Sequence, residues 1–274
     1  MKIQPRTIDQ RKNSDGFPKA GELIAMKPSQ ELSLQDARVF NVLIENAAGS
    51  ITSDRWHEIT MQKLRGPKHQ SSDRVRDSIK RLMTTLVEMP VRDRNGLAAV
   101  QTTPLLSENI ATIDENDPRA ILRYKLTETM RAIVENSKYW GRLKGYVIYA
   151  FSSRYALALY EAICLRINLE QDRQFLTVEQ FRDVMQISKG QYATFPPLRQ
   201  RVIDPALVEV NGLSDFIVTI EPVREGGMQR GKLKGFELAW RKKDADEWKT
   251  TLAELMRHHS GRRARLLGLV ESVK

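Results

Sequence analysis

The chain has 274 residues, of which 41% are hydrophobic and 28% charged, and its formal net charge at pH 7 is +10. This length suffices for one or two domains that each bury a core, and the composition excludes an intrinsically disordered chain. The excess of Lys and Arg favours a polyanionic partner, with nucleic acid ahead of a membrane surface.

The sequence disfavours both a membrane span and a disulfide. The longest uninterrupted apolar run, YVIYAF at 146–151, is far shorter than the roughly 20 residues that cross a bilayer, and the start lacks the apolar stretch of a secretory signal. The single cysteine, Cys164, lies in the apolar pattern of a predicted helix, so we expect a core thiol. We therefore expect a cytoplasmic protein without a membrane partner.

The chain is predicted to begin with a tail and a helix. Residues 1–30 mix Pro, Gly, Lys, Arg and Ser without an apolar period, so we expect a flexible basic tail. The segment Ser33-Leu-Gln-Asp36 has the pattern of a capping box and predicts a helix that ends near Gly49.

A second helix is predicted over 71–88, where apolar residues at positions 75, 79, 82 and 86 share one stripe. The other side of this helix is cationic. It is either a solvated face or a surface that contacts DNA. Its four cations are Arg74, Arg76, Lys80 and Arg81.

Two extended segments after this helix are joined by Asn95-Gly96, a strong signal for a β-hairpin. Residues 121–127 predict another strand, and residues 127–136 a short helix. The order helix, helix, hairpin is that of a winged-helix domain, which we place at residues 31–151.

The same order of elements begins again in the second half. Apolar residues at helical spacing predict a helix over 152–167, capped by Ser152 or Ser153. A capping-box pattern at 177–180 starts the next helix, and the alternating stretches FIVTIEPV and LKGFELAW predict a hairpin. We therefore predict an α+β fold of two tandem, pseudo-repeated winged-helix domains, each a helix-turn-helix plus a β-hairpin wing, the second at 152–243.

Residues 244–274 are predicted to form a C-terminal helix followed by a basic tail, and we expect the tail to be peripheral. The apolar side of the helix consists of Trp248, Leu252 and Leu255. The tail carries Arg262, Arg263 and Arg265.

Residues 195–211 combine a core face with a polar face. On a helical wheel Gln200, Arg201 and Asp204 point away from the apolar arc. Arg199 falls inside the arc, but a residue in the first turn can still splay toward DNA, because the end of a helix is less enclosed. Arg can address guanine edges or clamp phosphate, and Gln can address adenine edges. The segment is either a DNA-recognition helix or an ordinary amphipathic helix with surface charge. The apolar arc consists of Leu198, Val202, Ile203, Ala206 and Val210.

Pro205 lies in the middle of this segment. It has no N–H to donate to the carbonyl of Arg201, so the helix is predicted to kink or be irregular there.

The loop of the second hairpin, REGGMQRGKLK, spaces cations among glycines, as a wing along a phosphate backbone requires. Residues 226–232 also match most of a phosphate-binding P-loop, but Leu233 stands where a Ser or Thr would hold magnesium. The following GFELAW alternates like a strand, whereas a P-loop must open a helix, so we expect no nucleotide here. The wing cations are Arg224, Arg230, Lys232 and Lys234.

Several stretches carry a family resemblance. In the second half, SSRYALALYE (152–161), FLTVEQFRDVMQI (175–187), VIDPALVEVN (202–211) and GKLKGFELAW (231–240) resemble the initiator proteins of iteron-containing theta plasmids, the twin winged-helix RepE, RepA and RepB type. The first half is similar to the N-terminal domain of that family in LRG (64–66) and DSIKRLMTTLVE (77–88).

The resemblance implies that the C-terminal domain reads the origin repeats (iterons), while the N-terminal domain dimerises and contacts DNA more weakly. It also implies that monomers bind the repeats, that a homodimer in equilibrium with them represses its own promoter, and that the host initiator and replicative helicase are recruited. Carried onto this chain, the DNA-facing positions are Arg199, Gln200 and Arg201, with Lys189 and Tyr192 in the preceding turn. The Pro196-Pro197 pair and the arginine-rich C-terminus depart from the closest family members.

Enzymatic alternatives fail on the residue inventory. A nicking initiator needs a His-x-His pair, which none of the 4 histidines forms. A tyrosine recombinase would use the His-x-x-Arg match at 259–262, but the last tyrosine is Tyr192. One cysteine cannot supply the thiolates of a zinc site, so we expect no catalytic residue, metal or cofactor. The remaining alternative is a winged-helix transcriptional repressor without a replication role.

Overall fold

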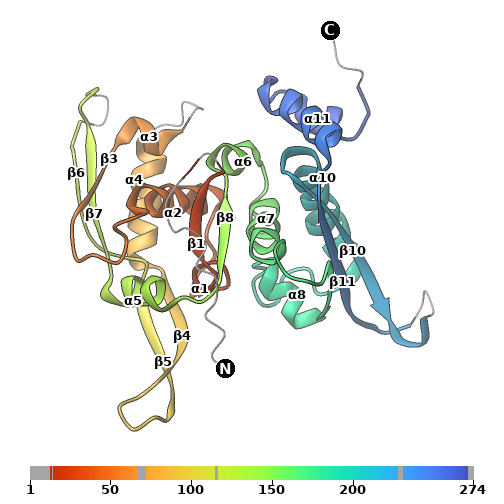
Figure 1. The fold of residues 1–274 in the computed structure, drawn as a ribbon, viewed down its shortest axis with the longest axis horizontal. Helices are drawn as coiled ribbons and strands as arrows, with labels where there is room; N and C mark the ends of the chain where they lie inside the picture. The colour runs from red at the N-terminus through yellow and green to blue at the C-terminus, as the bar shows by residue number, and fades with distance from the viewer. Residues whose placement is uncertain (1–12, 14, 67–71, 115–116, 228–230, 271–274) are drawn as a thin grey trace. The chain divides into compact units, whose positions relative to one another are not determined.

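The computed structural model describes residues 13, 15–66, 72–114, 117–227 and 231–270 (Figure 1). The chain divides into two compact units, Met1–Gly145 and Tyr146–Lys274. The division falls after Gly145, whereas the sequence predicts a boundary after residue 151. Within the described ranges, no helix is both long and apolar enough to cross a membrane.

The chain is folded from Phe17 onward, so the prediction of a flexible tail is wrong for the end of residues 1–30. Strand β1 (Phe17–Ala20) is buried along its length and pairs antiparallel with β8 (Trp140–Leu143), and α1 (Gly21–Ile24) follows it. Lys19 is only 3% exposed and donates to the Asn41 side chain at 3.0 Å. Because the partner strand lies far along the chain, local composition gives no sign of this pairing. Residues 1–12 lie outside the described part.

The first unit contains a winged helix. Its elements in chain order are α2 (Leu34–Ala47), β3 (His57–Thr60), α3 (Met61–Arg65), α4 (Ser72–Thr84), β6 (Leu106–Ala111) and β7 (Ile121–Leu126). The three strands form one sheet in the order β3–β7–β6. The predicted capping box at Ser33 is confirmed, with reciprocal hydrogen bonds between Ser33 and Asp36. The predicted strand and helix at 121–136 are confirmed as β7 and α5 (Glu128–Asn136).

The hairpin predicted at Asn95-Gly96 is present, but it is not the wing of this domain. Strands β4 (Leu86–Arg92) and β5 (Ala98–Pro104) form a separate sheet with β2 (Lys27–Pro28), in the order β2–β4–β5. The wing is instead the later β6–β7 hairpin. The helix predicted over 71–88 ends at Thr84. The Thr85 hydroxyl then donates a hydrogen bond to the Arg81 carbonyl at 2.6 Å, and β4 begins at the next residue.

The second unit repeats the pattern. After α6 (Gly145–Ala150), its elements are α7 (Arg154–Arg166), β9 (Arg173–Thr177), α8 (Val178–Val184), α9 (Phe195–Leu198), a π-helical turn (Arg199–Ile203), α10 (Asp204–Leu213), β10 (Phe216–Arg224) and β11 (Leu233–Lys242). Ser153 caps α7, and the predicted capping box at Thr177 is confirmed. Cys164 is buried in α7, as expected for a core thiol.

Corresponding strands pair in the same way in both units. The strand that precedes the helix-turn-helix pairs with the last strand of the wing, which is β3 with β7 in the first unit and β9 with β11 in the second. The sheet orders β6–β7–β3 and β10–β11–β9 therefore correspond. The prediction of an α+β fold with two pseudo-repeated winged-helix domains is confirmed.

The C-terminal residues are folded onto the second unit, so the prediction of a peripheral tail is wrong. Helix α11 (Ala245–Met256) and α12 (Arg262–Leu266) both pack against α10. The side chains of Arg262 and Arg265 are only 12% and 18% exposed, because both pair with the buried Glu254. The predicted apolar side of α11, at residues 248, 252 and 255, is half-buried.

A glycine in β11 allows β9 to approach. A Cβ atom at Gly235 would lie 2.1 Å from the carbonyl oxygen of Leu176 and 2.7 Å from the ring of Phe175. We expect Gly235→Ala to lower the free energy of unfolding by about 1–3 kcal/mol, because the strands must separate to admit the methyl group. Urea unfolding measures the effect. A variant as stable as the wild type would contradict the β9–β11 register.

Candidate nucleic-acid interface

The second helix of the helix-turn-helix in the second unit runs from α9 through the π-helical turn into α10. All five residues of the predicted apolar arc, from Leu198 to Val210, are buried. They fix this segment against the core of the unit, where α10 packs on α7 and β10. The face opposite this arc is therefore the one available to a partner.

The irregularity predicted in the middle of the segment is confirmed as a π-helical turn directly before Pro205. The Asp204 N–H donates to the carbonyl of Arg199, five residues back, instead of to that of Gln200. Pro205 has no N–H to continue an α-helical ladder, and its ring would press on the carbonyl of Arg201. The wider turn accommodates both constraints.

The π-helical turn exposes three consecutive polar side chains. Arg199, Gln200 and Arg201 are all exposed, and Arg199 is 61% exposed with its Nε 3.4 Å from Asp204 Oδ1. The wheel prediction that Arg199 lies inside the apolar arc is therefore wrong. An ideal wheel assumes 3.6 residues per turn, whereas the π-helical turn holds more and rotates Arg199 outward.

The turn before this helix is held by a residue that the sequence did not single out. Arg182 of α8 donates to the carbonyls of Ser188 at 3.0 Å, Gln191 at 2.6 Å and Tyr192 at 3.3 Å. These bonds fix the turn that carries Lys189, which is exposed. A lone Arg on an amphipathic helix gives no sequence signal for such a role.

Tyr192 is half-buried in this turn rather than directed fully outward. It has a positive φ of 46°, and its ring meets the ring of Tyr155 edge-on at 6.2 Å. Burial, together with the hydrogen bond to Tyr192, raises the pKa of Tyr155. Tyr192 therefore links the turn to α7, besides offering part of its ring to a partner.

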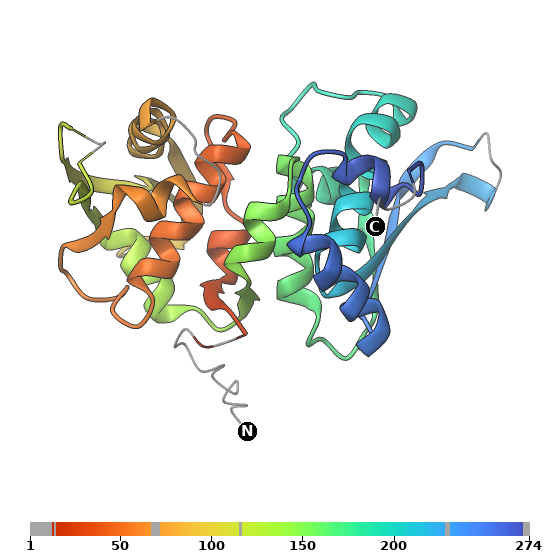
Figure 2. The same ribbon diagram turned by 90° about the horizontal axis from the view of Figure 1, so that it is seen from above.

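The base of the wing contacts the second helix of the helix-turn-helix, residues 195–213, which is called the reading helix below. Arg224, the last residue of β10, lies over the ring of Phe195 at 5.1 Å and donates to the carbonyl of Gly231 at 2.9 Å. Lys232 and Lys234 of the wing are exposed. The Nζ atom of Lys234 lies 4.0 Å from Oε1 of Glu225. Figure 2 shows the β10–β11 hairpin extending from the body of the second unit. Arg230 lies outside the described residues.

The segment that matches a P-loop is followed by a strand, not by the helix that a P-loop requires. Residues 233–242 form β11, so the glycine-rich loop opens a strand and presents no helix N-terminus to a phosphate. Lys232 is left as a surface cation of the wing.

A carboxylate from the reading helix fixes the start of α7. Glu209 of α10 is 8% exposed and accepts from the backbone N–H of Ser152 at 2.8 Å and of Ser153 at 3.2 Å, and also from the Ser152 hydroxyl. It satisfies the backbone N–H groups at the entry to α7, whose N-cap is the Ser153 side chain. The apolar stripe around Glu209 predicted the helix but not this contact.

In the first unit, only part of the predicted cationic face of α4 is available to a partner. Arg81 forms a two-pronged ion pair with Asp36, 2.7 Å at its shortest, and the Asp36 side chain is 1% exposed. Arg76 donates to the carbonyl of Ile113 at 3.0 Å, in the loop of the β6–β7 wing. Lys80 is exposed, and the side chain of Arg74 lies outside the described part.

Arg81 therefore has a structural role in the first unit, and its contact with DNA stays a prediction. Burial alone would raise the pKa of Asp36, but hydrogen bonds from Arg81, Ser78 and Ser33 outweigh it and hold that pKa below its ordinary value. The charge of Arg81 is used to keep a buried carboxylate ionised inside the winged helix. Sequence spacing on α4 could not reveal a partner on α2.

These features define a tandem winged-helix DNA-binding protein. A family model described as "Initiator Replication protein, WH1" matches residues 19–164, and one described as "Initiator Rep protein, WH2" matches residues 177–237. The chain therefore belongs to the plasmid replication initiator family.

A solved structure also matches: the WH1 domain of MSBI1.176, a replication protein isolated from a multiple sclerosis patient. It shares 12% identity over 37% of this chain and 79% of its own, with a TM-score of 0.28, so the family assignment rests on the family models alone. The search of curated proteins finds no match.

We expect Arg81→Met to lower the free energy of unfolding by about 1–2 kcal/mol at pH 7, because Asp36 loses its charged partner. The loss stays moderate because Arg81 is 44% exposed. A depressed carboxyl pKa stabilises the fold above the ordinary value of 3.8, and this contribution is lost as the pH falls through the folded-state pKa. The difference between wild type and variant should therefore shrink in urea unfolding series taken toward pH 3.

Arg119→Met is the matched control, since the Arg119–Asp117 pair has a similar distance of 2.8 Å but its arginine is 88% exposed. We expect a change below about 0.5 kcal/mol. Equal effects of the two substitutions would show that the Asp36 pair has no special structural role.

Proposed function

We propose that this replication initiator binds origin repeats in a sequence-specific manner through Arg199, Gln200 and Arg201. The observation that carries the proposal is the π-helical turn, which presents these three consecutive side chains together at the start of the reading helix. Arg can bind a guanine edge with two hydrogen bonds, and Gln an adenine edge. The wing cations Arg224, Lys232 and Lys234, with Lys189 in the turn, then contact flanking phosphates.

The proposal extends to the partners of the bound protein. Monomers bind the repeats, a homodimer in equilibrium with them represses the promoter of the initiator gene, and DNA-bound monomers recruit the host initiator and the replicative helicase. The family membership supports these steps. The protein acts as a scaffold for origin opening and carries out no catalytic step of its own, in line with the residue inventory.

A transcriptional repressor remains the second candidate, because the same modules serve both roles. Footprinting on the DNA that flanks the gene separates them. Protection of direct repeats of about 20 base pairs, two helical turns, beside an AT-rich stretch supports an initiator, whereas a single protected palindrome supports a repressor.

Arg201→Ala should weaken binding to the specific repeat by about 1–3 kcal/mol and relax the preference at one base pair. The measurement is competition binding against a set of repeats with single base substitutions. Arg263→Ala, which removes an exposed arginine from α12, is the control and should bind like the wild type. A uniform loss on all sequences would make Arg201 a phosphate clamp.

Lys232→Ala should lower affinity on all sequences and reduce the slope of log K against log salt by about one, because one phosphate contact is lost. Lys249→Ala on α11 removes an exposed lysine remote from the wing and should leave the slope unchanged. Identical slopes for Lys232→Ala and the wild type would remove the wing from the interface.

A further inference from the structure

The C-terminal helices cover the end of the reading helix. Helices α11 and α12 pack against α10, and they follow residue 237, where the family match ends. Figure 1 shows α11 beside α10 and apart from the far end of the β10–β11 hairpin. This part of the chain therefore contacts the reading helix without belonging to the surface proposed to face DNA.

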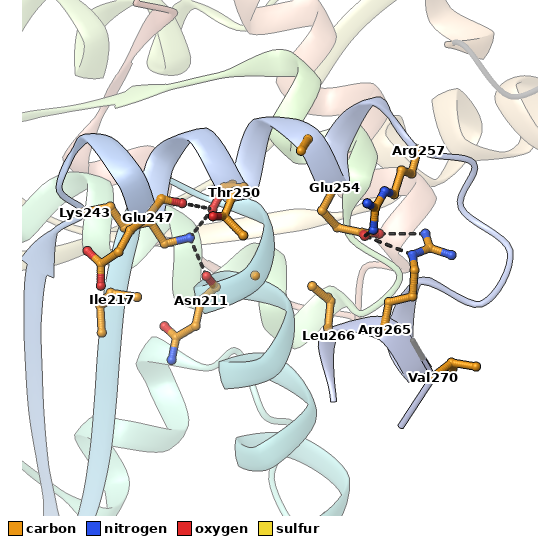
Figure 3. A pocket seen from close by; sticks show the side chains of 13 residues that line it. Asn211, Ile217, Lys243, Glu247, Thr250, Glu254, Arg257, Arg265, Leu266 and Val270 are labelled. Carbon is orange, nitrogen blue, oxygen red and sulfur yellow. Dashed lines mark hydrogen bonds and ion pairs between the residues drawn. The ribbon is translucent and has the colours of Figure 1, made fainter. Parts of the chain in front are cut away.

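Lys243 makes the central contact. It lies between β11 and α11, and its Nζ donates to the backbone carbonyl of Asn211 and to the hydroxyl of Thr251, the latter at 2.5 Å (Figure 3). The Asn211 carbonyl is in the last turn of α10, where carbonyls have no partner within the helix. A cation at this place also interacts favourably with the helix dipole.

Other contacts hold the same end of α10. The Asn211 side chain donates to the carbonyl of Val218 at 3.0 Å and accepts from its N–H at 2.8 Å, which ties α10 to β10. Leu266 of α12 lies so close to Gly212 that a Cβ there would be 2.4 Å from its Cδ2. The carbonyl end of α10 is thus held by β10, by Lys243 and by α12.

Helix α12 depends in turn on Glu254. This carboxylate is 7% exposed and pairs with Arg265 at 2.7 Å and with Arg257 at 3.8 Å (Figure 3). It also pairs with Arg262 at 3.4 Å. A helix of one turn has no stability of its own, so these ion pairs keep it in place. Lys243, Glu254, Arg257 and Arg265 line one cavity of about 550 Å³.

We propose that Lys243 is a positioning residue for DNA recognition, which fixes the carbonyl end of α10 and thereby holds Arg199, Gln200 and Arg201 in register with the bases. The inference rests on the proposed function. At about 1.5 Å per residue, position 211 lies about 15 Å from position 201 along the helix. A tilt of about 5° over that length moves the reading residues by roughly 1.3 Å, more than the roughly 0.5 Å that a preorganised site tolerates.

The titration of Lys243 gives a readout that a purely structural role would not produce. Burial lowers the pKa of Lys243 to about 8. The charges of Glu247 on α11 and Asp215 before β10 oppose this shift, whereas the charge of Arg241 on β11 adds to it. Arg265 of α12 lines the same cavity. Because the folded-state pKa is depressed, deprotonation relieves a burial cost and the stability contribution of Lys243 rises between about pH 8 and its ordinary value of 10.5.

The test compares Lys243→Met with Thr251→Val, which removes the hydroxyl but keeps the shape, and with the exposed Lys249→Met as control. Binding to the repeat and to unrelated DNA is measured well below the unfolding temperature. We expect Lys243→Met to lose about tenfold in affinity for the repeat, Thr251→Val less, and neither to change nonspecific affinity or the salt slope. An unchanged ratio of specific to nonspecific affinity, an equal loss on both DNAs, or a slope lowered by one would overturn the proposal.

The same binding is then measured from pH 7 to pH 9. We expect the wild-type specificity ratio to fall severalfold, because a neutral amine donates weaker hydrogen bonds to the Asn211 carbonyl and the Thr251 hydroxyl even though its burial costs less. The ratio of Lys243→Met should stay flat. Identical pH profiles would overturn the proposal. If the wild type shows no preference for the repeats, the proposed function fails; if Arg201→Ala behaves as expected and Lys243→Met binds like the wild type, only the role of Lys243 fails.

Discussion

Pro205 has no backbone N–H, and the helix that must accommodate it widens by one residue directly before it. In a regular α-helix, three consecutive side chains spread over more than half of the circumference, so they cannot all face one partner. The π-helical turn places Arg199, Gln200 and Arg201 on the exposed side while Val202 and Ile203 stay in the core. The surface proposed to read DNA in the second unit depends on this local departure from helical geometry.

The neighbouring elements fix that surface through single, well-placed polar contacts. Arg182 holds the preceding turn through three carbonyls, Arg224 joins the base of the wing to Phe195, and Glu209 ties the middle of the segment to α7. Lys243 donates a hydrogen bond to the Asn211 carbonyl at the C-terminal end of α10. Each contact satisfies a backbone group or a charge that would be unpaired in a bare helix-turn-helix, so rigidity and polar satisfaction come from the same residues.

The two units use one arrangement for different purposes. In the second, Arg199 and Arg201 of the reading helix and Lys232 and Lys234 of the wing are exposed, whereas Arg224 lies over Phe195. In the first, Arg81 supports the buried Asp36 and Arg76 bonds to the loop of its own wing. Because Arg81 and Arg76 are engaged within the first unit, α4 has fewer cations available to contact a phosphate backbone.

Features determined by local sequence could be predicted, and features determined by distant partners could not. The capping boxes at Ser33 and Thr177, the Asn95-Gly96 hairpin and the irregularity at Pro205 each follow from a few adjacent residues. The burial of β1 against β8, the pairing of Arg81 with Asp36 and the docking of α12 depend on residues far away in the chain. The ideal wheel placed Arg199 inside the apolar arc for another reason, since it assumes a constant number of residues per turn.

The most direct test of the reading surface is cleavage of bound DNA from position 200. Cys164 is the only cysteine and is 2% exposed, so Gln200→Cys can carry an iron chelate as a unique label. Cuts within each origin repeat, and none from the same label at Lys249→Cys on α11, are the result expected. Bound DNA that is cut from position 249 and left intact from position 200 would contradict the assignment of this helix as the part that enters the groove.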